Sequence, residues 1–175
     1  DTILLLGDNT DELGGSEYLY IMEGLVAGEP PSVDLLAERR LQHAVLAMIQ
    51  SGLLHSAHDV SDGGLACALA ESALGREDGP LGIDVTLHDT LPTVPLLFGE
   101  AQGRVIISCN ARSLDDVLRL AKRHGVPCRS IGETVPAEDG FRITTRAPAI
   151  EVDLEVLSEL FFDTIPNLMD GASRS

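Results

Sequence analysis

Tryptophan is absent from the 175-residue sequence, aromatic residues make up only 3% of it, and cysteine occurs three times. With so few aromatic side chains, the core has to be built mainly from Leu, Val, Ile and Ala. The length and the 44% hydrophobic content are enough for such a core without disulfides or metals. No apolar run reaches the roughly 20 residues that a membrane-spanning helix needs, and no secretory signal pattern is present. The sequence therefore predicts a globular domain with no membrane partner.

Basic residues are also scarce. Lys and Arg number 12 against 28 Asp and Glu, which gives a formal net charge of −16. An acidic surface repels the phosphate backbone of nucleic acids and anionic membranes, so we expect no nucleic-acid partner. A small phosphorylated ligand stays compatible with this charge if a divalent cation neutralises it.

The three cysteines, Cys67, Cys109 and Cys128, are an odd number and contain no CxxC spacing. Cys67 falls in a predicted apolar helix and Cys109 in a predicted apolar strand. This pattern favours buried, reduced thiols in a cytoplasmic protein. The sequence starts at Asp1, without Met, and runs straight into the apolar segment 2–7, so we expect a domain that was cut from a longer chain.

Hydrophobic periodicity and turn signals predict the elements. Strands are predicted over residues 2–7, 53–60, 81–87, 104–109, 129–135 and 141–147. Helices are predicted over residues 16–26, 34–51, 63–74, 113–124 and 154–162, with a short helical turn after Pro95. The first helix is expected to turn Leu19, Met22 and Val26 inward. Ser113 and Asp116 are typical of a capping box.

This order of elements favours an α+β fold in which helices pack on a mixed β-sheet. Segment 104–135 predicts a strand–helix–strand unit with a short connection. Residues 1–166 are expected to form a single domain. Residues 167–175, which follow Pro166, are expected to be a frayed tail.

The HDVSDGG junction (residues 58–64) places Asp59 and Asp62 ahead of two glycines that open a helix. The sequence puts Ser61 or Asp62 at the N-cap position. Two glycines also let another molecule approach the backbone closely. Three backbone amides at this helix start would lack intrahelical partners, namely those of Gly63, Gly64 and Leu65.

A phosphate group would fit such a helix start, but the two carboxylates would oppose it. A Mg²⁺ ion held by Asp59 would remove this objection, because hard cations take carboxylate and phosphate oxygens together. The residues are equally compatible with an ordinary strand–helix junction that has an Asp cap. His58, taken alone, is typical of a partly buried, hydrogen-bonded histidine.

The DELGGSEY junction (residues 11–18) repeats this arrangement. It again follows a predicted strand and places carboxylates ahead of Gly14 and Gly15, and a helix again opens, at Ser16. The two junctions are compatible with one shared cleft, or with two separate turns on an acidic surface.

A third polar segment, LFGEAQGR (residues 97–104), brings together Glu100, Gln102 and Arg104 just before a predicted strand. In an extended segment these side chains would project to one side. An acid, an amide and a base on one face can recognise a sugar or an amide, although a polar strand entrance has the same pattern. No Ser-His-Asp or Cys-His set can be assembled by spacing, and no P-loop or dinucleotide motif is present.

Taken in order, the segments LLLGDNTDELGGSEYL, HDVSDGGLACALAES, LFGEAQGRVIIS and IGETV resemble the C-terminal domain of the phosphoribosylformylglycinamidine synthase family. The resemblance covers nearly the whole chain and is to the second of two internally duplicated halves. It implies a fold like the C-terminal domain of aminoimidazole ribonucleotide (AIR) synthase. Other ATP-dependent enzymes of that superfamily resemble the chain more loosely and lack DELGGSEY.

The resemblance implies an ATP-dependent ligase of purine synthesis. That enzyme converts formylglycinamide ribonucleotide to formylglycinamidine ribonucleotide with ammonia from a glutaminase subunit or domain. It further implies Mg²⁺ and ATP or ADP in the full enzyme, ATP-binding domains elsewhere in the same chain, and a cytoplasmic location. The isolated domain is expected to be inactive. Exposed apolar surface left by the missing domains would favour a dimer.

The same resemblance assigns roles to residues where the motifs match. Asp59 would supply a Mg²⁺ ligand and no residue here would be catalytic. The expected nucleotide or phosphate contacts are Ser61, Gly63 and Gly64. The expected substrate-side residues are Gly14, Gly15, Ser16, Glu100, Gln102 and Arg104.

Ala101 and Gly103 depart from the family pattern, which has serine or a larger residue there, so hydroxyl contacts are not expected at these positions. We expect the domain to belong to the auxiliary rather than the catalytic cleft of the duplicated enzyme. Two other interpretations stay open at this point. One is the corresponding domain of another superfamily enzyme, such as AIR synthetase or selenophosphate synthetase, and the other is a non-catalytic scaffold domain.

Overall fold

The computed structural model describes residues 1–75, 79–146 and 150–172. Its strands are β1 (Thr2–Leu6), β2 (Ser56–Asp59), β3 (Gly82–Thr86), β4 (Val105–Cys109), β5 (Cys128–Val135), β6 (Phe141–Thr144) and β7 (Ile150–Val152). Its α-helices are α1 (Glu17–Glu23), α2 (Leu35–Gln50), α3 (Gly64–Leu74), α4 (Thr93–Phe98), α5 (Leu114–His124), α6 (Leu154–Phe162) and α7 (Thr164–Ala172). Two short 3₁₀ helices are η1 (Ala111–Ser113) and η2 (Ala137–Asp139).

The described strands form a seven-stranded sheet in the order β2-β4-β1-β5-β3-β6-β7. β3 and β6 are parallel, and the other neighbouring pairs are antiparallel. β4, α5 and β5 form the predicted strand–helix–strand unit, but β1 lies between the two strands of that unit. The sheet is therefore mixed, and the predicted α+β fold is confirmed.

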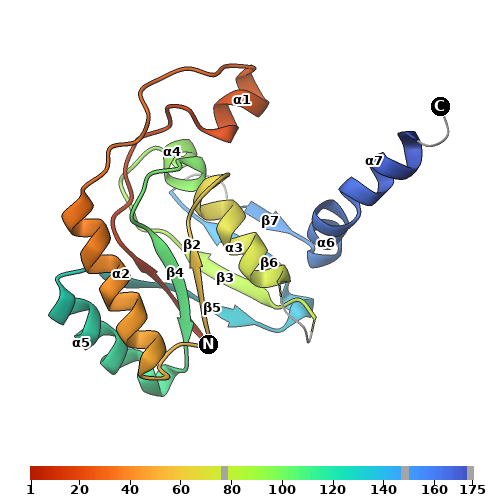
Figure 1. Ribbon diagram of the computed structural model, residues 1–175. Coiled ribbons are helices and arrows are strands. Elements are labelled where there is room, and N and C mark those ends of the chain that lie inside the picture. Colours follow the sequence, from red (N-terminus) through yellow and green to blue (C-terminus); the bar gives the residue numbers. More distant parts are fainter. Residues whose placement is uncertain (76–78, 147–149, 173–175) are drawn as a thin grey trace.

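Helices cover both faces of this sheet (Figure 1), with α2 and α5 on one face and α3 on the other. β1 shows how the sequence produces this arrangement, because alternate residues of a strand point to opposite faces. Ile3 and Leu5 belong to the core beneath α3, α4 and α6, whereas Leu4 and Leu6 belong to the core beneath α2 and α5. An unbroken apolar run thus becomes a central strand that is buried on both sides.

The small residues of α3 let this helix lie close to the sheet. Its sequence GLACALAESAL buries one whole side of the helix, and the buried residues are Gly64, Leu65, Ala66, Ala68, Leu69, Ala73 and Leu74. α2 instead buries a narrow stripe, Leu41, Ala44 and Met48, as its amphipathic pattern predicts. α3 is the helix that begins at the HDVSDGG junction, so that junction is fixed to the core.

α1 differs from its prediction. It ends at Glu23 instead of Val26, because Gly24 adopts a left-handed conformation with φ +65°. Met22 and Val26 are 62% and 85% exposed, so the predicted inward positions are wrong for these two residues, whereas Leu19 is half-buried. Figure 1 shows why, since α1 lies at the tip of a long loop beyond the sheet.

Three further differences concern element ends. The strand predicted over 53–60 is shorter in the structure, where β2 spans Ser56–Asp59 and single backbone bonds from His55 and Val60 extend its contact with the β4 segment. The chain at Leu53 is still turning out of α2, and its amide donates to the Met48 carbonyl. The predicted capping box is wrong, because Ser113 makes no side-chain cap and Asn110 caps η1 instead. The chain continues past Pro166 as α7, where the sequence predicted fraying, while residues 173–175 of that tail lie outside the described residues.

Candidate functional site

Asp59 ends β2 and is exposed to solvent. The Ser61 hydroxyl donates a hydrogen bond to Asp59 Oδ2, and this bond is the main cause that lowers the pKa of the Asp59 carboxyl below 3.8. Asp59 is therefore ionised at neutral pH and presents a carboxylate to solvent. The structure thus joins two of the residues that the HDVSDGG motif singled out.

The N-cap of α3 is Gly63, with φ +75° and no side-chain cap, so the predicted Ser61 or Asp62 cap is wrong. The turn is too tight for a longer side chain at the helix start. Gly64 has φ +70°, and a Cβ atom there would lie 2.8 Å from the carbonyl oxygens of Leu97 and Gly99. Glycine is needed at this position because the helix start rests directly on the backbone at the C-terminal end of α4.

Two of the three amides expected to be free at this helix start already have acceptors. Gly63 N–H donates to Glu100 Oε1 at 2.8 Å, and Gly64 N–H donates to the Ser61 carbonyl at 3.0 Å. The prediction of free amides is therefore wrong for these two residues. A carboxylate of the chain itself occupies the position next to Gly63 where an external anion was expected.

The DELGGSEY junction has the predicted cap. Ser16 is the N-cap of α1, its hydroxyl accepts a bond from the Leu19 amide at 3.4 Å, and it is only 2% exposed. The adjacent backbone is just as tightly packed, since a Cβ atom on Gly14 would lie 2.0 Å from the Glu29 carbonyl oxygen. The amide of Glu17 donates to Glu100 Oε1 at 2.9 Å.

Glu100 thus joins the two junctions. The same carboxylate oxygen accepts one amide from the start of α1 and one from the start of α3. Glu17 and Gly63 lie 83 and 37 residues from Glu100 in the sequence, so no local pattern could have indicated this contact. The two motifs that the sequence singled out are neighbours in space.

Glu100, Gln102 and Arg104 were predicted to project to one side of an extended segment, but this segment is not a strand, and Arg104 is buried while Gln102 is exposed. β4 begins only at Val105. Arg104 is 2% exposed and donates to the Gly99 carbonyl at 2.5 Å and to Asn9 Oδ1 at 3.2 Å. Burial lowers its pKa to about 10, so it is still charged at neutral pH. The hydrogen bonds of its guanidinium stabilise the conformation of the loop between α4 and β4.

Four of the predicted site residues nevertheless share a hollow. A cavity of about 420 Å³ lies between α2 and the start of β4, and its lining includes Asp59, Ser61, Gln102 and Arg104. The rest of its wall is largely the side of α2, including Leu41, Val45 and Ile49. This hollow is the place where the chain could receive a small ligand beside the Asp59 carboxylate.

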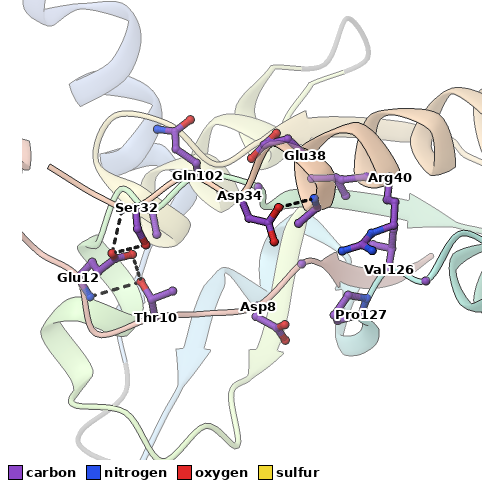
Figure 2. Close-up of a pocket in the computed structure, with 16 residues that line it drawn as sticks. Asp8, Thr10, Glu12, Ser32, Asp34, Glu38, Arg40, Gln102, Val126 and Pro127 are labelled. Carbon is purple, nitrogen blue, oxygen red and sulfur yellow. Dashed lines mark hydrogen bonds between the residues drawn. The ribbon is translucent and has the colours of Figure 1, made fainter.

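An acidic cavity of about 400 Å³ adjoins it and shares Glu38, Leu41, Gln102 and Gly103 with the first. Figure 2 shows that loop residues close one end of this cavity while the start of α2 forms another wall. Glu12 Oε1 accepts bonds from the Ser32 amide at 2.9 Å and the Ser32 hydroxyl at 2.8 Å. These bonds, the backbone bond first, lower the pKa of Glu12 below 4.5.

Sequence reasoning missed the Glu12–Ser32 pair. The DELGG string did contain this carboxylate, but its partner lies 20 residues away beyond a proline-rich break. Within the described residues, no group of three or more His, Cys, Asp or Glu side chains could hold a metal ion. Asp59 would thus be a single protein ligand and would need oxygens from elsewhere.

Cys67 was expected to be buried but is exposed, whereas Cys109 is buried and Cys128 is half-buried. The Cys67 thiol lies beside the HDVSDGG junction, since a Cβ atom on Gly63 would come within 2.4 Å of its sulfur. Partial burial, followed by the charges of Glu71 and Glu100, raises the pKa of the Cys67 thiol. The described part of the chain contains no helix long and apolar enough to cross a membrane.

Known proteins resemble this chain in sequence and in fold. The family model described as "AIR synthase related protein, C-terminal domain" matches residues 1–144. Phosphoribosylformylglycinamidine synthase subunit PurL from Caldanaerobacter subterraneus is 42% identical over 159 residues, which cover 91% of this chain and 21% of the relative. The chain therefore spans about a fifth of the length of the curated relatives it matches.

Two solved structures of PurL from Thermotoga maritima have the same fold. The complex with FGAR superposes with a TM-score of 0.70 at 24% identity, over 90% of this chain and 27% of that chain. The complex with ATP superposes with a TM-score of 0.64 at 23% identity, over 90% of this chain and 25% of that chain. Since the family model matches most of the sequence and the solved structures share its sheet and helices, the chain belongs to the family of the AIR synthase related C-terminal domain.

Proposed function

We propose that this chain is a C-terminal domain of phosphoribosylformylglycinamidine synthase. That enzyme is the ATP-dependent ligase that converts formylglycinamide ribonucleotide to formylglycinamidine ribonucleotide in purine biosynthesis. The 42% identity with the Caldanaerobacter protein, maintained over 91% of the chain, carries this proposal. The cavity beside Asp59 and Ser61 supports it, because both residues belong to the motif that the resemblance places near nucleotide phosphates.

Mg²⁺ fits the residues present. Asp59 offers one ionised, solvent-facing carboxylate, and Mg²⁺ is commonly held by one or two carboxylates together with phosphate oxygens and waters. The absence of a three-ligand cluster in the described segments agrees with this mode of binding and disagrees with an all-protein cage. When bound, the ion would neutralise phosphate charge in this acidic domain.

The chain's own groups would hold the ligand in place. Asp59 would hold the ion, and Ser61, whose hydroxyl orients the Asp59 carboxylate, would lie beside the phosphates. Gly63 and Gly64 would contact a phosphate only after Glu100 and the Ser61 carbonyl released their amides. Gln102 and Arg104 line the same cavity. The role of Arg104 would be structural, because its guanidinium bonds to the Gly99 carbonyl in the loop beside the cavity.

The remaining parts of the proposal concern the whole enzyme. The domain would pair with ATP-binding domains of the same chain and receive ammonia from a glutaminase subunit or domain, in the cytoplasm. It would form the auxiliary cleft and be inactive alone. Its exposed apolar side chains would favour a dimer of the isolated domain; they include Tyr20, Ile21, Met22, Leu25, Val26, Leu160, Phe161, Phe162, Ile165, Leu168 and Met169.

The test uses the full-length parent chain with formylglycinamide ribonucleotide, ATP, Mg²⁺ and ammonium, and measures ADP and the amidine product. We expect substrate-dependent formation of both. ATP hydrolysis that depends on a different acceptor would contradict the proposal and would place the chain with another ligase or kinase of the superfamily. In the same protein, Asp59→Asn is expected to lower the amount of Mg-nucleotide that copurifies. Unchanged nucleotide content would contradict the role of Asp59.

A further inference from the structure

One side chain links the two glycine-rich junctions. Glu100 is half-buried after the end of α4, and its Oε1 atom accepts the Gly63 amide at 2.8 Å and the Glu17 amide at 2.9 Å. We propose that Glu100 is a positioning residue, which sets the start of α1 against the start of α3 and does not itself contact a ligand. This inference rests on the proposed function only where it concerns nucleotide binding.

The geometry explains why one carboxylate oxygen can serve both helices. A carboxylate oxygen has two lone pairs and can accept two N–H donors at once. Hydrogen bonds to an ionised acceptor are stronger than bonds to a neutral one. The amide of Gly63, the N-cap of α3, is one of the first N–H groups of the helix, which have no acceptor within the helix and need one from outside. Glu100 supplies this acceptor from a distant segment.

On the α1 side, the Glu17 amide donates to Glu100 from a loop whose two ends are already bonded to each other. The Glu12–Ser32 bonds tie the two ends of the loop together, and the Gly15 amide donates to the Ala27 carbonyl at 2.9 Å. Nearer the tip, Tyr18 stacks on Phe98 with ring centroids 5.1 Å apart. The loop over residues 8–34 is thus internally bonded, and Glu100 is one of the contacts that fix its tip to the domain.

On the α3 side, the same oxygen accepts the amide of Gly63, which lies two residues after Ser61. Gly63 follows Ser61, which orients the Asp59 carboxylate, and the Gly64 amide bonds back to the Ser61 carbonyl. A shift of the α3 start would therefore move Ser61 and Asp59. Through Glu100, the position of the α1 loop is coupled to the geometry of the cavity beside Asp59.

Replacing Glu100 with glutamine tests whether its role depends on accepting hydrogen bonds or on carrying a negative charge. In Glu100→Gln the amide oxygen can still accept both backbone N–H groups, whereas Glu100→Ala removes the acceptor altogether. Glu23→Ala is the matched control, because Glu23 lies in the same loop, at the exposed end of α1. All three variants are made in the full-length parent chain.

The first measurement is hydrogen exchange of the Gly63 and Glu17 amides without ligand. We expect both amides to lose protection together by at least about tenfold in Glu100→Ala, and to keep most of it in Glu100→Gln and Glu23→Ala. The inference would be overturned if the two amides exchanged in Glu100→Ala at the same rates as in the unmodified protein, or if only one of them lost protection.

The second measurement is the Mg-ADP concentration that half-protects the peptide over residues 56–66 from exchange. It should rise by at least about tenfold in Glu100→Ala and by less than about threefold in Glu100→Gln. Equal losses in the two variants would overturn the positioning role and indicate a direct contact that needs the charge. Absence of any Mg-ADP protection in the unmodified protein would contradict the proposed function, and the inference would then be decided by the ligand-free exchange alone.

Discussion

The two glycine-rich junctions have similar sequences but are stabilised in different ways. Each places carboxylates ahead of two glycines and opens a helix. α3, which begins at the HDVSDGG junction, buries seven of its 11 residues, while α1, which begins at the DELGGSEY junction, buries none of its seven. α3 is therefore held by apolar packing, and α1 is held by polar bonds and one aromatic contact.

The comparison shows what a motif can and cannot specify. The glycines and the acids specify a turn that opens a helix, because these preferences are local. Whether that helix joins the core depends on a matching apolar surface opposite it. α3 faces the sheet, whereas within the described residues α1 meets mainly Phe98 and the Glu100 carboxylate.

The largest expected effect comes from removing apolar packing. Leu69→Ala in α3 should lower the free energy of unfolding by about 2–5 kcal/mol, because Leu69 is 1% exposed and its loss leaves a cavity. Leu25→Ala, the same change just beyond α1 at 51% exposure, should cost no more than about 0.5 kcal/mol. Urea denaturation of the two variants measures the difference. Equal losses would show that the α1 loop is packed as tightly as the core.

A second pair of substitutions separates backbone strain from lack of space. Gly64 and Gly15 have nearly the same conformation, φ +70° and +71°, but a Cβ atom on Gly15 would meet nothing within 4 Å. Gly15→Ala should therefore cost only the left-handed strain, about 1–2 kcal/mol. Gly64→Ala adds a clash with two carbonyl oxygens and should cost about 3 kcal/mol or more. Similar unfolding energies for the two variants would contradict the tight contact at the α3 start.

The aromatic contact should account for part of the attachment of α1. Tyr18→Ala removes the stack on Phe98 and is expected to cost about 1 kcal/mol. Tyr20→Ala on the same helix is the matched control, because Tyr20 is 58% exposed and should contribute little. Faster proteolysis within residues 8–34 of the Tyr18 variant, but not of the Tyr20 variant, would confirm the contact in solution.

The smallest expected effect is a dependence on pH that is confined to the α1 loop. The Ser32 bonds hold the pKa of Glu12 below its ordinary 4.5. A depressed carboxyl pKa stabilises the folded loop above pH 4.5, and this contribution is lost as the pH falls through the folded pKa. The NMR shift of the Ser32 amide should thus titrate with a midpoint below 4.5, and Glu12→Gln should abolish this step. A midpoint at or above 4.5 would contradict the pair.

The sequence predicted those elements whose cause is local. β1, α2, α5 and α6 were placed to within a few residues because apolar spacing and turn residues determine them.

What the sequence could not provide depends on distant partners. The apolar residues of α1 do follow a helical spacing, yet the described chain offers them no surface, so Met22 and Val26 are exposed. Arg104 is an unusual buried arginine, and its acceptors are mostly backbone carbonyls, which no side-chain pattern reveals. Glu100 bonds two amides far away in the chain, and only the fold brings them together.

The position of β1 in the sheet has a consequence for biosynthesis. β1 is paired on one side with β4 and on the other with β5, so its partners are about 100 and 130 residues downstream. At a ribosome speed of roughly 5–20 residues per second, the TILLL segment would wait on the order of ten seconds before either neighbour exists. During that interval this apolar strand lacks both of its sheet neighbours, which makes it a segment that a cotranslational chaperone could bind.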